Sequence, residues 1–268
     1  MGRTLTYPKG VSNTVNRYKH RATYDLGAIH SIINTSQVLN VSFNPGPEDP
    51  FPTILPMIGQ MGSFEYPSAT IDEPLECYLH GYVSSRIMNL ARKSGSKEQG
   101  LPICISTSRV DGIVLSLTPN SHNYNYRSAT LHGYAKLVTC EEEKLWAMKF
   151  ITNSVVADRW DHSRVPPDRA EMSSTVILKV DVVAGSGKIR DGGVSDERKD
   201  TQNGDVTKRI WTGVIPVWEM FGEPIPSDGN MVTEIPEHIS SFIANRNAQN
   251  QAYAERAVHI ALPPEEQH

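Results

Sequence analysis

The fold is decided by one stretch of the sequence, LPICISTSRVDGIVLSLTPNSHNYNYRSATLHGYAKLV, residues 101–138. Apolar and polar residues alternate along most of it, as they do in half-buried β-strands. We expect three strands here, over Ile103–Ser108, Gly112–Leu117 and about Tyr126–Val138. A tight turn at Val110–Asp111–Gly112 should join the first two, and Gly133 should form a β-bulge in the third. Strands this close in sequence predict antiparallel pairing.

Similar patterns extend outward from this stretch. Strands are expected at Leu39–Phe43, Thr53–Met57, Glu76–Leu79 and Val176–Val182. Asn44–Pro52 is rich in proline and should be a loop, and Gly185–Asp205 is rich in Gly, Asp and Lys and should be a mobile surface loop. Trp211–Met220 is apolar and is expected to be the last core element.

Three helices are expected between these strands. One follows Asp25 as N-cap and carries an isoleucine stripe, and one follows Ser84 or Ser85 and ends at Gly95. The third follows Thr139 and opens with Glu141–Glu143, whose charges suit a helix N-terminus. The resulting fold class is mainly β, an antiparallel β-barrel with a few short peripheral helices. We expect a loose arm over 1–16, one barrel domain over 17–226 and a polar, partly helical tail over 227–268.

Composition narrows the function. The chain has 268 residues with a net charge of −4, 38% hydrophobic and 21% charged residues, which is typical of a globular protein. This charge argues against a nucleic-acid partner, which would select a basic surface. No apolar run has the length of a membrane-spanning helix, and the N-terminus does not look like a secretory signal. We therefore expect a cytoplasmic protein without membrane association.

Cysteines and histidines give no metal signature. Cys77, Cys104 and Cys140 form no C-x-x-C pair, and we expect Cys104 and Cys140 to be small core residues in a reducing compartment. His80, His122 and His132 could converge, but their spacing matches no zinc motif. The interpretation is that no metal site is present. Neither a P-loop nor a G-x-S-x-G nucleophile elbow occurs.

One segment combines several phosphate-binding groups, His80-Gly81-Tyr82-Val83-Ser84-Ser85-Arg86. A strand ends here, and two hydroxyls and a guanidinium arrive at a helix N-terminus, where backbone N–H groups favour anions. The alternative is that Ser84 and Ser85 only cap the helix while Arg86 is solvated. Two further clusters are Asn125-Tyr126-Arg127-Ser128 and Ser186-Gly187-Lys188-Ile189-Arg190, the latter followed by Trp211. An exposed arginine on a barrel strand is the alternative for Arg127.

Taken in order, these segments resemble the pyridoxamine 5'-phosphate oxidase-like, FMN-binding split-barrel family, and within it the flavin-nucleotide-binding branch related to nitroimidazole-resistance reductases. The resemblance rests on Tyr78–Gly81, Ser85-Arg86, Val110–Leu115, Asn125–Ser128 with Gly133, Glu142–Lys144, Arg159-Trp160 with Arg164, Ser186–Arg190 and Trp211–Pro216. It covers about residues 17–226 and implies an FMN-binding split β-barrel.

The resemblance also implies roles for individual residues. Ser85 and Arg86, with Ser84 beside them, would hold the FMN phosphate, and His80 and Gly81 would lie against the ribityl chain or the ring. Tyr126, Arg127 and Ser128 would line the same pocket, and Lys188 and Trp211 would approach the flavin from later in the chain. Family members are typically homodimers, so a homodimer is expected. Flavin performs hydride transfer itself, so the chemistry requires no nucleophile or acid–base pair from the protein.

Two departures from the family pattern limit the activity. Ser116-Leu117-Thr118 stands where the family commonly has Ala-Arg-Ser, so Leu117 replaces an arginine. The last residues, ALPPEEQH, lack the basic motif of true pyridoxamine phosphate oxidases, which argues against vitamin B6 oxidation. Our first hypothesis is an FMN-dependent oxidoreductase that uses a small organic substrate and a nicotinamide donor, NAD(P)H, or oxygen. The alternatives are a non-catalytic flavin or haem sensor with His80 or His132 as haem ligand, and a cofactor-free dimeric barrel.

Overall fold

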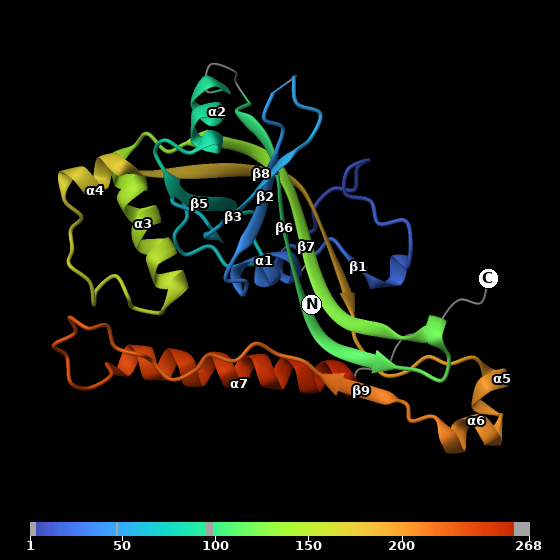
Figure 1. Cartoon of the computed structure of the whole chain (residues 1–268). Coiled ribbons are helices and arrows are strands. Elements are labelled where there is room, and N and C mark those ends of the chain that lie inside the picture. The colour runs from blue at the N-terminus through green and yellow to red at the C-terminus, as the bar shows by residue number, and fades with distance from the viewer. Residues whose placement is uncertain (1–3, 47, 95–98, 260–268) are drawn as a thin grey trace. The chain divides into compact units, whose positions relative to one another are not determined.

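A computed structural model describes residues 4–46, 48–94 and 99–259 of the chain (Figure 1). Its contacts divide into two compact units. Unit 1 comprises Met1–Ser108 and Ser128–Gly187, and unit 2 comprises Arg109–Arg127 and Lys188–His268. Three long strands contribute residues to both units, namely β6 (Leu101–Leu115), β7 (Asn123–Leu137) and β8 (Thr175–Arg190).

Unit 1 holds most of the shorter elements. They are η1 (Lys19–Arg21), β1 (Ala22–Thr23), α1 (Leu26–Asn34), β2 (Leu39–Phe43), β3 (Thr53–Met57), β4 (Gly59–Gly62), β5 (Glu76–Tyr82), α2 (Arg86–Ser94), α3 (Glu141–Val155) and α4 (Arg169–Ser174). Unit 2 adds η2 (Pro119–Ser121), α5 (Arg198–Thr201), α6 (Gly204–Arg209), β9 (Gly213–Pro216) and α7 (Glu237–His259).

The strands form one sheet in the order β3-β2-β6-β7-β8-β5-β4, with β1 paired to β8 and β9 paired to β6. The pairs β2–β3, β2–β6, β4–β5, β5–β8 and β6–β9 are antiparallel. Mainly antiparallel strands with short helices confirm the predicted fold class, a split β-barrel. None of the helices in the described ranges is long and apolar enough to cross a membrane.

Several predicted elements are confirmed, and local chemistry explains them. The Asp25 carboxylate accepts a hydrogen bond from the Ala28 amide at 2.7 Å and so caps α1, whose isoleucines are buried. Strands β2 and β3 have the predicted bounds. In unit 1, α3 packs on β5, where the Tyr78 and Trp146 rings meet edge to face with centroids 5.1 Å apart. Only the start of this helix differs from expectation, because Cys140 precedes it instead of Thr139.

The turn predicted at Val110–Gly112 is wrong, because β6 runs through it as one strand. Asp111 is buried, and its carboxylate accepts a hydrogen bond from the Arg127 guanidinium at 3.1 Å. Gly112 pairs with Pro216 of β9. In sequence, Asp followed by Gly favours a turn. Here the partners of Asp111 and Gly112, Arg127 and Pro216, hold both residues in the sheet instead.

Gly133 does not form the predicted bulge. Burial alternates without a break along β7 through this residue. A Cβ at Gly133 would lie 2.5 Å from the carbonyl oxygen of Asp181 and 2.8 Å from a Val180 methyl group. Glycine is therefore required here by the close approach of the neighbouring strand β8.

The predicted mobile loop over Gly185–Asp205 is also wrong. Strand β8 continues to Arg190, and α5 and α6 follow. The Asn203 side chain accepts hydrogen bonds from the amides of Asp205 and Val206, which caps α6. The polar residues that suggested a loop therefore include helix-capping groups.

Three smaller expectations are corrected as well. Trp211–Met220 is not a core element, because only β9 forms there, and Trp211 and Met220 are 66% and 74% exposed. The arm is not loose throughout, since Tyr7 is buried and the Asn13 amide donates to the Gly185 carbonyl at 2.9 Å. Cys140 is exposed and Cys77 is the buried cysteine. Gly95, the predicted end of the second helix, lies outside the described residues.

Candidate functional site

The strand β5 ends at Tyr82, and α2 begins four residues later at Arg86, forming the β5–α2 corner. The Ser85 amide donates to the Tyr82 carbonyl at 3.0 Å, and the Asn89 amide donates to the Ser85 carbonyl at 3.1 Å. The latter is the first hydrogen bond of the helix. The N–H groups of Arg86, Ile87 and Met88 have no intrahelical acceptor, as is usual for the first helical turn.

The hydroxyl of Ser85 does not cap this helix. Its Oγ is buried and has no hydrogen-bond partner among the described residues. Ser84 and Arg86 are exposed beside it. The corner therefore combines an orphaned hydroxyl, free amide groups at a helix N-terminus and a guanidinium, which together can bind a phosphate. The alternative that Ser85 only caps the helix is therefore not supported for its side chain.

His80 and Gly81 lie directly before this corner on β5. His80 is exposed, and its amide donates to the Ile58 carbonyl at 2.9 Å. Desolvation lowers the pKa of His80, which disfavours the protonated imidazole. The space beside Gly81 is taken by the end of the Met88 side chain, 2.4 Å from where a Cβ would be. Gly81 thus lets α2 pack closely on β5.

The other predicted site residues lie on β7, β8 and the segment before β9. Arg127 is buried, whereas Tyr126 and Ser128 on either side of it are half-buried, as strand alternation requires. Arg127 and Ser128 therefore point to opposite faces of β7. Lys188 lies within β8 and is half-buried. The exposed Trp211 ring lies against Gly213, where a Cβ would approach it to 2.6 Å.

The predicted site residues are divided between the two units. Unit 1 contains His80, Gly81, Ser84, Ser85, Arg86 and Ser128, and unit 2 contains Tyr126, Arg127, Lys188 and Trp211. The first five come together at the β5–α2 corner. We therefore treat this corner as the candidate phosphate site.

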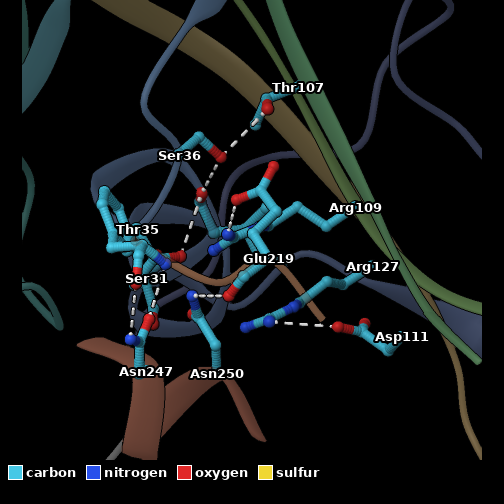
Figure 2. A network of polar contacts seen from close by, with 12 residues as sticks. Ser31, Thr35, Ser36, Thr107, Arg109, Asp111, Arg127, Glu219, Asn247 and Asn250 are labelled. Carbon is cyan, nitrogen blue, oxygen red and sulfur yellow. Dashed lines mark hydrogen bonds and ion pairs between the residues drawn. The ribbon is translucent and has the colours of Figure 1, made fainter. Parts of the chain in front are cut away.

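In unit 2, Arg127 has partners that the sequence did not reveal. Its guanidinium pairs with Asp111, as Figure 2 shows, and its central carbon lies 3.5 Å from the ring centroid of Tyr253 on α7. Burial raises the pKa of Asp111, and the charge and hydrogen bond of Arg127 oppose that rise. No local motif could have paired residues so far apart in the chain.

Leu117, which stands where the family commonly has arginine, is buried in unit 2. Its amide donates to both carboxylate oxygens of Asp196, at 3.0 and 3.2 Å. The apolar side chain has thus become part of the packing, and the backbone group binds an acidic residue of the following segment.

The three candidate histidines do not form a metal cluster. Across residues 4–46, 48–94 and 99–259, no group of three or more His, Cys, Asp or Glu side chains is placed to hold a metal ion. His122 accepts a hydrogen bond from the Ser116 amide at 3.0 Å through Nδ1. The Nδ1 atom of His132 is buried and has no hydrogen-bond partner in the part of the chain that the structure describes, and desolvation lowers the pKa of His132.

The family model described as pyridoxamine 5'-phosphate oxidase matches residues 25–189, more than half of the chain. No curated protein sequence matches. The flavocytochrome Anf3 from Azotobacter vinelandii is similar in structure, with a TM-score of 0.69 and 24% identity, covering 87% of this chain and 97% of that one.

The FAD and heme binding protein from Mycobacterium smegmatis is similar with a TM-score of 0.66 and 21% identity, covering 83% of this chain and 97% of that one. At 24% and 21% identity, these two similarities show a shared fold. Both structural matches cover more of the chain than the family model does.

Proposed function

The chain belongs to the pyridoxamine 5'-phosphate oxidase family, and we propose that it binds FMN and acts as a flavin-dependent oxidoreductase on a small organic substrate. The observation that carries the proposal is the β5–α2 corner, where the buried Ser85 hydroxyl has no partner in the described chain and adjoins Arg86 at the start of α2.

The residues of the corner fit a phosphate monoester. A phosphate dianion needs donors and positive charge, and the corner offers the Ser85 hydroxyl, the first amides of α2 and the Arg86 guanidinium. Ser84 is exposed beside them and can add a second hydroxyl. FMN, when bound, would supply the hydride-transfer chemistry. The protein's part is to hold the phosphate and to set the charge near the ring.

Reduced flavin carries additional negative charge, which a nearby cation would stabilise. Arg127 and Lys188 are the two candidates from the sequence. Within unit 2, Asp111 already offsets the charge of Arg127. We also propose that two copies of the chain associate, as the family resemblance implies, which light scattering of the flavin-loaded protein would test.

The redox part of the proposal is tested by anaerobic reduction of the flavin-loaded protein with NADH or NADPH. We expect bleaching of the visible flavin absorption at a rate that saturates with donor concentration, and recovery of the absorption when oxygen is admitted. Free FMN at the same concentration is the control. Bleaching no faster than that of free FMN with either donor would contradict oxidoreductase activity with a nicotinamide.

A second candidate function is haem binding. The observation that favours it is His132, whose buried Nδ1 has no hydrogen-bond partner among the described residues. Desolvation lowers its pKa, which favours the neutral imidazole that ligates metals. The two structurally similar proteins are named as a flavocytochrome and as an FAD and heme binding protein. Haem titration should then give a Soret band that shifts in His132→Ala and remains unchanged in His162→Ala, whose imidazole is exposed.

A further inference from the structure

The helix α7 presents one polar and small-residue face to the rest of unit 2. Asn250, Ala254 and Ala257 are buried on it, and Arg246 and Tyr253 share that side at helical spacing. The Asn250 side chain donates to the Glu219 carbonyl at 2.9 Å (Figure 2). The Ala257 carbonyl accepts from the Gly192 amide at 2.6 Å and from the Asn125 side chain at 3.3 Å. These bonds fix α7 against Asn125 of β7 and against the segments that contain Gly192 and Glu219.

Three arginines lie on the buried side of this helix. Arg246 belongs to α7 itself, and Arg109 and Arg127 come from β6 and β7. The side chains of Arg109 and Arg127 are only 9% and 10% exposed. Arg246 is half-buried. Its pKa is lowered by desolvation and by the nearby charges of Arg109 and Arg127, while Glu219 acts in the opposite direction. The contacts of Glu219 place Arg246 near Arg109, because the Glu219 carboxylate pairs with Arg109 and the Glu219 carbonyl accepts from Asn250, one turn of α7 from Arg246.

Carboxylates offset this charge in part. Asp111 pairs with Arg127, and Glu219 pairs with Arg109 (Figure 2). Glu219 is 57% exposed, so solvent screens its charge. The face of the Arg127 guanidinium rests on the Tyr253 ring, and its buried Nε has no hydrogen-bond partner among the described residues. The cluster thus contains two guanidinium groups that are largely removed from solvent, and the Nε–H of Arg127 meets no acceptor among the described residues.

We propose that Arg109, Arg127 and Arg246 form a binding site for a phosphate-class oxyanion in unit 2. A planar guanidinium is the side chain best suited to bind phosphate oxygens through paired N–H groups. An anion among the three arginines would replace their mutual repulsion with charge-assisted hydrogen bonds. The site uses α7, which lies outside the residues that match the family. It does not depend on flavin binding at the β5–α2 corner.

The test is calorimetric titration with inorganic phosphate and with pyrophosphate at fixed ionic strength, using the full chain with Arg86→Ala so that anion binding at the β5–α2 corner is weakened. We expect saturable binding that Arg246→Gln weakens by about tenfold or more, as loss of a charge-assisted bond should. Glu219→Gln should strengthen binding. The matched control is Arg198→Gln, which removes an exposed cation of α5 in the same unit.

Circular dichroism checks that each variant is folded. Arg246→Lys serves as the second variant, because it keeps the charge and should bind with intermediate affinity.

Repeating the titration on flavin-loaded protein that retains Arg86 identifies the source of the anion. Lost phosphate binding assigns the cluster to the phosphate of the flavin, and retained binding assigns it to a separate anion. Absence of saturable binding, or equal affinities in Arg246→Gln and Arg198→Gln, would overturn the proposal.

Discussion

The guanidinium of Arg127 stacks on the ring of Tyr253, with its central carbon 3.5 Å from the ring centroid. Arg127 belongs to β7, inside the residues that match the family, and Tyr253 belongs to α7, outside them. Because Asp111 also holds Arg127, one buried cation links β6, β7 and α7 within unit 2. Arg127 is therefore a structural residue here, whatever ligand it also contacts.

Replacing Asp111 with Asn should destabilise the protein strongly. Burial raises the pKa of Asp111 more than Arg127 lowers it, so the intact pair need not be a large net stabiliser. Removing its negative charge nevertheless leaves Arg127 buried without a counter-ion, at a cost of about 3 kcal/mol. Urea unfolding measures the change. Asp181→Asn is the control, because its pair with Lys136 is nearly half exposed and should contribute about 0–1 kcal/mol.

The phosphate role of the β5–α2 corner predicts that Arg86→Ala weakens FMN binding by about 1.5–3 kcal/mol. Ser85→Ala should weaken it by about 1 kcal/mol, since one neutral hydrogen bond is lost. Quenching of flavin fluorescence on titration measures both affinities. Lys93→Ala removes an exposed cation from the last turn of the same helix and should leave the affinity unchanged. Unchanged affinity in Arg86→Ala would remove Arg86 from the phosphate site.

His30 predicts a loss of stability in mild acid. The Tyr7 hydroxyl lies 2.6 Å from its Nε2 and the Ile71 carbonyl 2.7 Å from its Nδ1, so Nδ1 carries the proton and Nε2 accepts from Tyr7. Burial lowers the pKa of His30 below its ordinary 6.5. Below pH 6.5 His30 of the unfolded chain binds a proton that the folded protein resists. The free energy of unfolding therefore decreases as the pH is lowered.

The variant His30→Gln should lack this contribution. Its unfolding free energy should fall between pH 6.5 and pH 5 less steeply than that of the wild type, by up to about 1.4 kcal/mol per pH unit. His20→Gln removes an exposed histidine and serves as the control. Parallel pH profiles for His30→Gln and the wild type would show that His30 does not resist protonation in the folded protein.

Gly133→Ala should destabilise the sheet by about 1–3 kcal/mol, because its new methyl group would meet the Asp181 carbonyl, which is backbone and cannot rotate away. Gly193→Ala is a matched control, since no atom lies within 4 Å of its would-be Cβ. It should be neutral or slightly stabilising. Thermal unfolding compares the two, and equal melting temperatures would be inconsistent with the close approach of β7 and β8.

The sequence predicted elements well where one local rule decides them. Alternation found β2, β3 and β7, and the Asp25 cap placed the start of α1. It failed where a distant partner decides the structure. Asp111 and Gly112 have the composition of a turn, but Arg127 and β9 hold them in a strand.

The same contrast between local and distant partners applies to the candidate site. The β5–α2 corner was found because its residues are contiguous, and a strand that ends at a helix start is visible in the sequence. The cluster of Arg109, Arg127 and Arg246 was missed because its members are far apart in sequence and α7 was expected only as a partly helical tail. The orphaned state of the Ser85 hydroxyl is likewise a tertiary property, since in sequence a serine before a helix predicts a cap.

The most direct test of flavin binding is an absorption spectrum of the protein after incubation with FMN and passage through a desalting column. We expect the visible bands of oxidised flavin to elute with the protein in a near-stoichiometric amount, and to be lost in Arg86→Ala. A Soret band would instead support the haem function. A spectrum with protein absorption alone, after incubation with either FMN or FAD, would contradict flavin binding and favour a barrel that has lost its cofactor.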